Sequence, residues 1–241
     1  MSLNGRNIPL PIQKQLRREA NFGCVLCGCP IIIYGHIIPY HRIQAYLPEN
    51  IIALCPNHYT NFDRGEFSES YLRDAKKNPH NKIQVKDAFF IDSQDIAVNI
   101  GKSKFINTSR ILAVDDFDII SVNRENEKYI LFDINFFDKL NNLIAVVYEN
   151  SWTAEKRISS IWEIGYKPHH FLTIRNTPSD LFFEAKIENE ELFITASMYY
   201  NSAPLRITND GIWLGEREMA VELKECVLKN YDIGINAQTY Y

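Results

Sequence analysis

Two short-spaced pairs of metal-binding residues constrain the fold of this 241-residue chain more than any other feature. Cys24 and Cys27 form a Cys-x-x-Cys pair, and after 27 intervening residues Cys55 and His58 form a Cys-x-x-His pair. Each pair supplies two donors from one tight turn, so two pairs can close a tetrahedral zinc site. We therefore expect these four residues to hold a structural Zn²⁺, with Cys29 as a spare thiol beside them.

The cysteine count favours a metal site over a disulfide framework. The chain has five cysteines, an odd number, and four of them lie within residues 24–55. This pattern is typical of a metal site in a reducing compartment. No apolar run reaches the length of a membrane span, and no apolar signal segment follows the N-terminus. We expect a cytoplasmic protein with no membrane association.

The charge is divided unevenly along the chain. Residues 1–86 hold 11 Lys and Arg against 6 Asp and Glu, a net charge of +5. The remaining 155 residues hold 15 against 24, a net charge of −9. A basic segment fused to an acidic one favours a phosphate-bearing partner at the basic segment. A chance division of charge explains the same numbers equally well.

The secondary-structure patterns differ between the two parts of the chain. Helical patterns, the last with Ser68 as N-cap, cover residues 12–20, 56–62 and 68–77. After a linker at about residues 78–88, strand-like runs cover 96–100, 109–114, 119–122, 129–134, 143–148, 171–174, 182–187, 192–196 and 205–208. The sequence predicts an α+β protein. Residues 1–80 would form a small zinc-stabilised module, and residues 89–241 a mostly antiparallel all-β domain, a sandwich or a β-roll.

Two stretches of the β-rich part resemble each other. Glu-Asn-Glu occurs at 125–127 and again at 188–190, 63 residues later, and each copy is followed by aromatic residues and a tryptophan. One interpretation is a duplicated β unit. The other is that tight turns between strands favour asparagine and tolerate glutamate.

The segment between the two ligand pairs carries a second motif. His36 lies in Gly-His-Ile-Ile-Pro, and Asn50 opens Asn-Ile-Ile-Ala-Leu-Cys. With these segments, residues 6–80 resemble the HNH endonucleases, the ββα-metal nuclease superfamily. The matching segments are 24–27, 35–39, 50–55, Pro-Asn-His-Tyr at 56–59 and Phe-Asp-Arg-Gly at 62–65.

The resemblance implies a mechanism. His36 would be the general base that takes a proton from water, and Asn50 would hold the loop around His36 by hydrogen bonding. A divalent metal such as Mg²⁺ would stabilise the charge that develops on the phosphate. Candidate contacts to the phosphates of duplex DNA, which carry little sequence information, are Arg17, Arg18, Arg42 and Arg64.

Two positions depart from the family pattern. Many members have Asp, Glu or His before the base, where this chain has Gly35, and many have a metal-binding His where this chain has Tyr59. A phenol is a poor ligand for magnesium. Three nearby residues can substitute as ligands of the catalytic metal: His41, Asn61 and Asp63. Asp63 lies four residues after Tyr59, on the same helix face, although it can equally be a solvated or capping carboxylate.

Three functions follow from these observations. The first is a metal-dependent DNA endonuclease, by fold-level analogy in restriction or phage defence, which the β-rich domain regulates or targets. The second is a zinc module that binds nucleic acid or a protein partner without cutting. The third is a structural adaptor whose β-rich domain binds a protein partner or a second copy of the chain. The β-rich domain contains no Gly-rich phosphate loop and no nucleophile motif that would identify its role.

Overall fold

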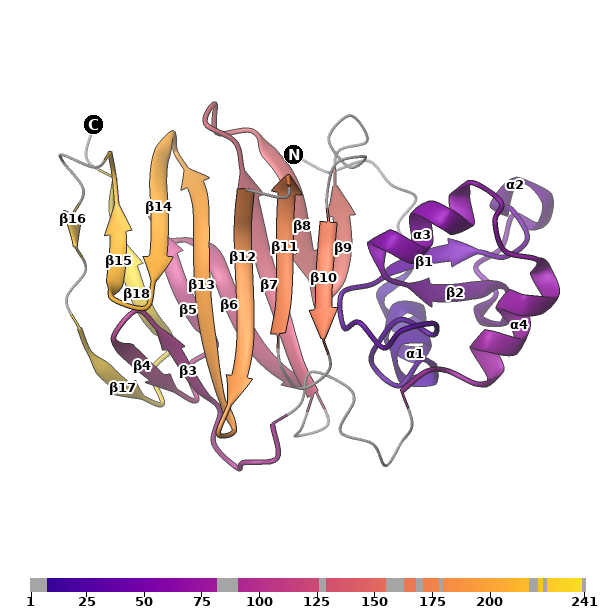
Figure 1. Cartoon of the computed structure of the whole chain (residues 1–241), viewed down its shortest axis with the longest axis horizontal. Helices are drawn as coiled ribbons and strands as arrows, with labels where there is room; N and C mark the ends of the chain where they lie inside the picture. The colour runs from indigo at the N-terminus through magenta and orange to yellow at the C-terminus, as the bar shows by residue number, and fades with distance from the viewer. Residues whose placement is uncertain are drawn as a thin grey trace.

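Helices gather at one end of the molecule and strands at the other (Figure 1). The computed structural model describes residues 8–81, 91–125, 129–154, 163–167, 171–177, 180–216, 221–222 and 225–239. The expected linker lies outside the described residues except for 78–81, and Glu-Asn-Glu at 125–127 is described only at Glu125. In the described part of the chain, no helix has the length and apolar character needed to cross a bilayer.

The N-terminal part contains four α-helices, one 3-10 helix and two short strands. In chain order these are α1 Leu10–Glu19, β1 Ile33–His36, α2 Tyr40–Ile43, η1 Pro48–Asn50, β2 Ile51–Leu54, α3 Pro56–Asp63 and α4 Glu69–Lys77. The three expected helices are confirmed as α1, α3 and α4. Ser68 is the N-cap of α4, because its hydroxyl accepts a hydrogen bond from the backbone N–H of Tyr71 at 3.2 Å.

A two-stranded antiparallel sheet lies at the centre of this part. In the register of β1 and β2, Ile33 faces Leu54 and His36 faces Ile51. All four residues of β2 are buried, as expected of an unbroken apolar run. Only Cys55 separates the end of β2 from the start of helix α3, so the chain passes from the hairpin directly into the helix.

The C-terminal part is built from β-strands. These are β3 Ala97–Ile100, β4 Ser103–Ile106, β5 Arg110–Val114, β6 Phe117–Glu125, β7 Tyr129–Phe137, β8 Leu143–Tyr148, β9 Ser151–Ala154, β10 Glu163–Lys167, β11 Phe171–Thr177, β12 Asp180–Glu188, β13 Glu191–Tyr200, β14 Ala203–Thr208, β15 Gly211–Leu214, β16 Val221–Glu222, β17 Val227–Lys229 and β18 Ile233–Ala237. All nine expected strands are present, and the other strands were not predicted.

The strands form two layers (Figure 1). One layer runs β10-β11-β12-β13-β14-β15-β16, and the other runs β9-β8-β7-β6-β5-β18. Most pairs are antiparallel, which confirms the expected α+β class with mostly antiparallel sheet; β3 with β13, β4 with β17 and β5 with β18 are parallel. The core contains the buried rings of Phe132 and Phe183, one from each layer, with centroids 5.6 Å apart.

The helical part packs directly against the β-sandwich. Ile32, which is fully buried, donates its backbone N–H to the carbonyl of Asn150 and accepts from the backbone N–H of Trp152. The segment before β1 thus forms a bridge to the edge of β9. The side chain of Asn57 in α3 donates to the carbonyl of Ile164 in β10 at 3.0 Å. One continuous apolar core therefore runs through both parts.

Candidate metal centre and the His36 loop

The four predicted zinc ligands converge on one point. The ligand atoms of Cys24, Cys27, Cys55 and His58 all lie within 4.8 Å of one another. The Nδ1 of His58 lies 3.4 Å from the Sγ of Cys24 and 3.3 Å from the Sγ of Cys55. The Sγ atoms of Cys27 and Cys55 are 3.8 Å apart. This Cys₃His group can hold a metal ion, with Nδ1 as the histidine donor.

Local backbone structure positions the first pair. Cys24 and Cys27 lie in a tight turn, closed by hydrogen bonds from the backbone N–H of Cys24 to the carbonyl of Cys29 and from Gly28 to Cys24. Gly28 has φ of +77°, and a Cβ there would lie 2.2 Å from the Oδ1 of Asn81. Only glycine meets both requirements, because it tolerates positive φ and has no side chain.

The second pair lies at the start of α3. Cys55 is the N-cap residue of the helix, and Pro56 occupies its first position. One helical turn therefore places His58 beside Cys55. The turn that carries Cys24 is linked to β2 by the hydrogen bond from the N–H of Val25 to the carbonyl of Ala53. The two pairs thus meet because β2 contacts the first pair and leads directly into the second.

The four ligand side chains shift one another's pKa values. Burial raises the pKa of Cys24, but hydrogen bonds with Cys27, Cys55 and His58 outweigh it, and the pKa of this thiol lies below its usual value. The hydrogen bond with Cys24 raises the pKa of Cys27 and that of Cys55. The same partner raises the pKa of His58. A bound cation would favour the thiolate form of all three cysteines.

Cys29 does not belong to the ligand group. Its side chain is buried and interacts with Cys55, but the group of mutually close ligand atoms contains only the other three cysteines and His58. Asn81, a residue of the expected linker, supports the site instead. Its side chain donates to the carbonyls of Asn21 and Gly28. Its position in the helix-breaking Asn-Pro-His-Asn segment gave no signal of this role.

His36 lies at the end of β1 among aromatic rings. Its imidazole centroid is 5.4 Å from that of Tyr40 and 5.8 Å from that of Tyr46. The two tyrosine rings are themselves 5.0 Å apart. The side chain of His36 is half-buried and its Nε2 atom is buried. Neither tyrosine was predictable from the sequence, because the fold of the intervening segment brings Tyr46 back to His36.

Asn50 fixes the backbone that follows His36. Its Oδ1 accepts a hydrogen bond from the N–H of Ile38 at 2.8 Å, and its Nδ2 donates to the carbonyl of Ile38, also at 2.8 Å. Its own backbone carbonyl accepts from the N–H of Ile37. Asn50 is 2% exposed, so these hydrogen bonds are shielded from water. The side chain therefore holds the Ile-Ile-Pro segment in place.

Aromatic rings fill the space beside Gly35. A Cβ on Gly35 would lie 2.8 Å from a ring carbon of Phe62 and 3.3 Å from one of Tyr59. Burial raises the pKa of Tyr59, and the nearby charge of Asp63 raises it further. The Tyr59 phenol therefore keeps its proton and offers no anionic ligand.

His41 and Asp63 do not form a group of mutually close metal ligands with His36. His41 and Asp63 are exposed, and Asn61 is half-buried. Across the described ranges, the Cys₃His group is the one set of three or more His, Cys, Asp or Glu side chains within metal-binding distance. In the part of the chain that the structure describes, His36 therefore lies outside any such group.

The four candidate phosphate contacts differ in exposure. The side chain of Arg17 is 1% exposed and forms ion pairs with Glu125 at 3.1 Å and Glu149 at 2.8 Å. It is not available to a nucleic acid, and its expected role as a phosphate contact is wrong. Arg18 is 59% exposed and pairs with Glu125 at 3.3 Å. Arg42 and Arg64 are exposed.

Comparisons of this chain with protein families, with curated proteins and with solved structures find no match. Its function must therefore be argued from its own residues and their geometry.

Proposed function

We propose that residues 8–81 form an HNH-type module that hydrolyses phosphodiester bonds in duplex DNA, with His36 as the general base. The observation that carries this proposal is the arrangement of His36 and Asn50. The imidazole stands at the end of β1, and Asn50 fixes the next two residues through three hydrogen bonds. A general base must be held at one place relative to the water that it deprotonates.

We propose Zn²⁺ as the ion of the Cys₃His group. Thiolates and imidazole are its usual ligands, with bond lengths of about 2.3 Å to sulfur and 2.0–2.1 Å to nitrogen. A tetrahedral site with these bond lengths separates two sulfurs by about 3.8 Å, and sulfur from nitrogen by about 3.6 Å. The observed separations of 3.8 Å and 3.3–3.4 Å fit this arrangement. Four protein ligands leave no open position, so the ion would be structural.

In the proposed reaction, neutral His36 takes a proton from water as the water oxygen attacks phosphorus. The bond from phosphorus to the leaving oxygen breaks, and that oxygen takes a proton from solvent. Asn50 acts through the backbone and touches neither water nor DNA. Because His36 lies outside any group of close metal ligands among the described residues, no step is assigned to a metal. Magnesium commonly binds through one or two carboxylates together with substrate phosphates. Asp63 is the carboxylate that we propose for that role once DNA is bound.

The exposed basic residues support a DNA partner. Arg42 lies in α2, six residues after His36, and Arg64 follows α3, the helix whose rings pack against Gly35. Both side chains are exposed. Contacts of this kind bind phosphates irrespective of sequence, and they make affinity fall with salt. Restriction or phage defence, in the cytoplasm, is the setting that fold-level analogy favours.

A second candidate function is a module that binds DNA without cutting it. The packing at Gly35 favours this function, because Phe62 and Tyr59 occupy the space where an acidic metal ligand would project. The ring of Tyr59 also stands where a histidine ligand is expected. In this case the module would keep its zinc and its salt-dependent affinity for DNA, but it would have no hydrolytic activity.

Plasmid nicking by the full chain separates the two candidates. Wild-type protein is incubated with supercoiled DNA and Mg²⁺, Mn²⁺ or Ni²⁺, beside His36→Ala and the control His80→Ala, an exposed histidine of the same module. We expect His36→Ala to cut about 10²–10⁴-fold more slowly, the typical contribution of a general base, with its zinc content unchanged. His80→Ala should cut normally.

Two results would contradict the nuclease proposal. One is cutting by His36→Ala at the wild-type rate. The other is no cutting by wild-type protein with any of the three metals; salt-dependent DNA binding would then favour the second candidate. An Asp63→Asn variant that cuts only at a raised Mg²⁺ concentration would support the proposed role of Asp63.

A further inference from the structure

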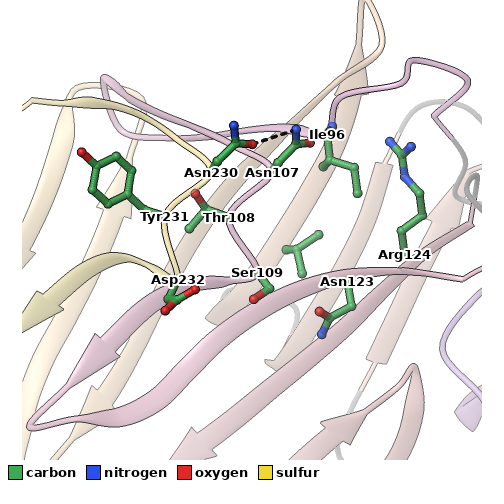
Figure 2. A pocket seen from close by; sticks show the side chains of 10 residues that line it. Ile96, Asn107, Thr108, Ser109, Asn123, Arg124, Asn230, Tyr231 and Asp232 are labelled. Carbon is green, nitrogen blue, oxygen red and sulfur yellow. Dashed lines mark hydrogen bonds between the residues drawn. The ribbon is translucent and has the colours of Figure 1, made fainter.

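A cavity of about 370 Å³ opens at the surface of the β-sandwich, lined by residues other than the Cys₃His group and His36. Figure 2 shows its lining, which comes from four separate segments. These are the start of β3, the connection between β4 and β5, the end of β6, and the loop between β17 and β18. Its volume falls in the range of small-molecule sites, about 300–1,000 Å³.

Three buried polar atoms of the lining have no hydrogen-bond partner among the described residues. They are Nε and Nη2 of Arg124 and Oγ1 of Thr108. Nη1 of Arg124 donates to the carbonyl of Gln94 at 3.2 Å, which fixes the far side of the guanidinium. Thr108 is only 4% exposed. Leaving a buried donor or acceptor unsatisfied is unfavourable, so a site that gathers three of them is suited to a ligand that satisfies them.

The chemistry of Arg124 specifies one end of that ligand. Nε and Nη2 lie on the same edge of the guanidinium and point in parallel, a geometry that matches the two oxygens of a carboxylate or phosphate. Such paired, charge-assisted hydrogen bonds are among the strongest in proteins. An oxyanion is therefore the group that this edge of Arg124 would bind.

The opposite side of the cavity specifies the rest of the ligand. Asp232 and Tyr231 lie across the cavity from Arg124 (Figure 2), and the ring of Tyr231 is 58% exposed. Asn107 and Asn230 form a hydrogen bond with each other at 3.3 Å on the same side. Asp232 accepts hydrogen bonds, and Tyr231 offers a flat face. A ligand here needs donor groups and a planar or apolar face at the end remote from its oxyanion.

We propose that this cavity binds a small polar molecule through a phosphate or carboxylate group on Arg124, with its remaining groups on Tyr231 and Asp232. The site is separate from the proposed nuclease chemistry and would exist whether or not the module cuts DNA. Arg124 also lies next to Glu125, which pairs with Arg17 and Arg18 of α1. The cavity is therefore one residue away from the contact between the sandwich and the helical part.

Ligand binding to the full chain tests this site. The probes are inorganic phosphate, acetate, adenosine monophosphate and adenosine, and adenosine serves as the control ligand without an oxyanion. Affinity is measured by calorimetric titration and by the rise in melting temperature. We expect at least one oxyanion probe to bind and adenosine to bind much more weakly. Comparing the affinities for phosphate and acetate shows whether the site prefers a phosphate or a carboxylate group.

Three variants locate the binding. Arg124→Gln removes the charge and Arg124→Lys keeps it without the paired donors; each should weaken binding about tenfold or more, a change of about 1.4 kcal/mol or more. Arg206→Gln, on β14 outside the cavity, is the matched control and should bind as the wild type does. Thr108→Val removes a hydroxyl that has no partner, so we expect it to fold normally and bind more weakly.

The proposal is overturned if no oxyanion probe binds the wild-type protein. It is also overturned if the Arg124 and Thr108 variants, with melting temperatures like the wild type, bind as tightly as Arg206→Gln. If Arg124→Gln fails to fold, Arg124→Lys and Thr108→Val decide the outcome by the same comparison.

Discussion

At the scale of single residues, Gly35 links the hairpin to helix α3. The family resemblance marked this position only as a missing ligand. The structure gives a physical reason for glycine, because the rings of Phe62 and Tyr59 lie where a side chain would begin. Sequence spacing could not predict this packing, since Gly35 and Phe62 are distant in the chain.

Gly35→Ala should destabilise the protein through overpacking. The added Cβ would lie 2.8 Å from a ring carbon of Phe62, so the ring must move. Overpacking of this kind costs about 1–3 kcal/mol in the free energy of unfolding. Chemical denaturation measures the loss, and Phe62→Leu in the same chain should restore part of it. Equal stability of Gly35→Ala and the wild type would show that the ring does not occupy this space.

At the scale of elements, much of the secondary structure was predictable. The Ser68 cap marked the start of α4, and apolar runs located nine strands, because both signals are local. Short strands with mixed burial were missed. In β10 and β17, buried and exposed residues do not alternate regularly, and these strands depend on pairing with their neighbours. Parallel pairing of β3 with β13 was also unpredictable, because it joins segments about ninety residues apart through backbone hydrogen bonds.

Asn50 holds the segment after His36 through its side chain. Asn50→Ala removes both side-chain hydrogen bonds to Ile38, so the backbone N–H and carbonyl of Ile38 lose these partners. Each unsatisfied buried group costs about 1–3 kcal/mol. We expect a clear fall in melting temperature for Asn50→Ala, with hydrogen exchange faster at Ile38. The exposed neighbour variant Glu49→Ala should melt as the wild type does; a similar fall in both would contradict this role.

At the scale of the whole molecule, the two parts are joined by buried contacts. The charge split suggested a basic module with its arginines turned to solvent. The structure instead buries Arg17 against Glu125 and Glu149 of the sandwich. A helical pattern shows which residues share a face, but it does not show which large partner that face meets. Part of the basic surplus therefore holds the acidic part of the same chain.

Arg17→Ala should destabilise the contact between the two parts. It leaves Glu125 and Glu149 without their buried cation, a change that costs about 3–5 kcal/mol when the pair is fully buried and less here, where the glutamates are partly exposed. Arg18→Ala is the matched control, since an exposed pair contributes about 0–1 kcal/mol. Calorimetry should show a lower or split transition for Arg17→Ala alone. Equal effects of the two variants would contradict this account.

We propose that one metal ion closes the Cys₃His group and holds the N-terminal part together. Elemental analysis of purified full-length protein tests it most directly. We expect one zinc per chain in the wild type and in the control Cys226→Ala. Cys55→Ala should lose the ion and much of the stability of the N-terminal part, since structural zinc contributes about 10–16 kcal/mol in small zinc modules. A wild-type protein that folds without any bound metal, or a Cys55→Ala variant with unchanged zinc content and melting, would contradict the claim.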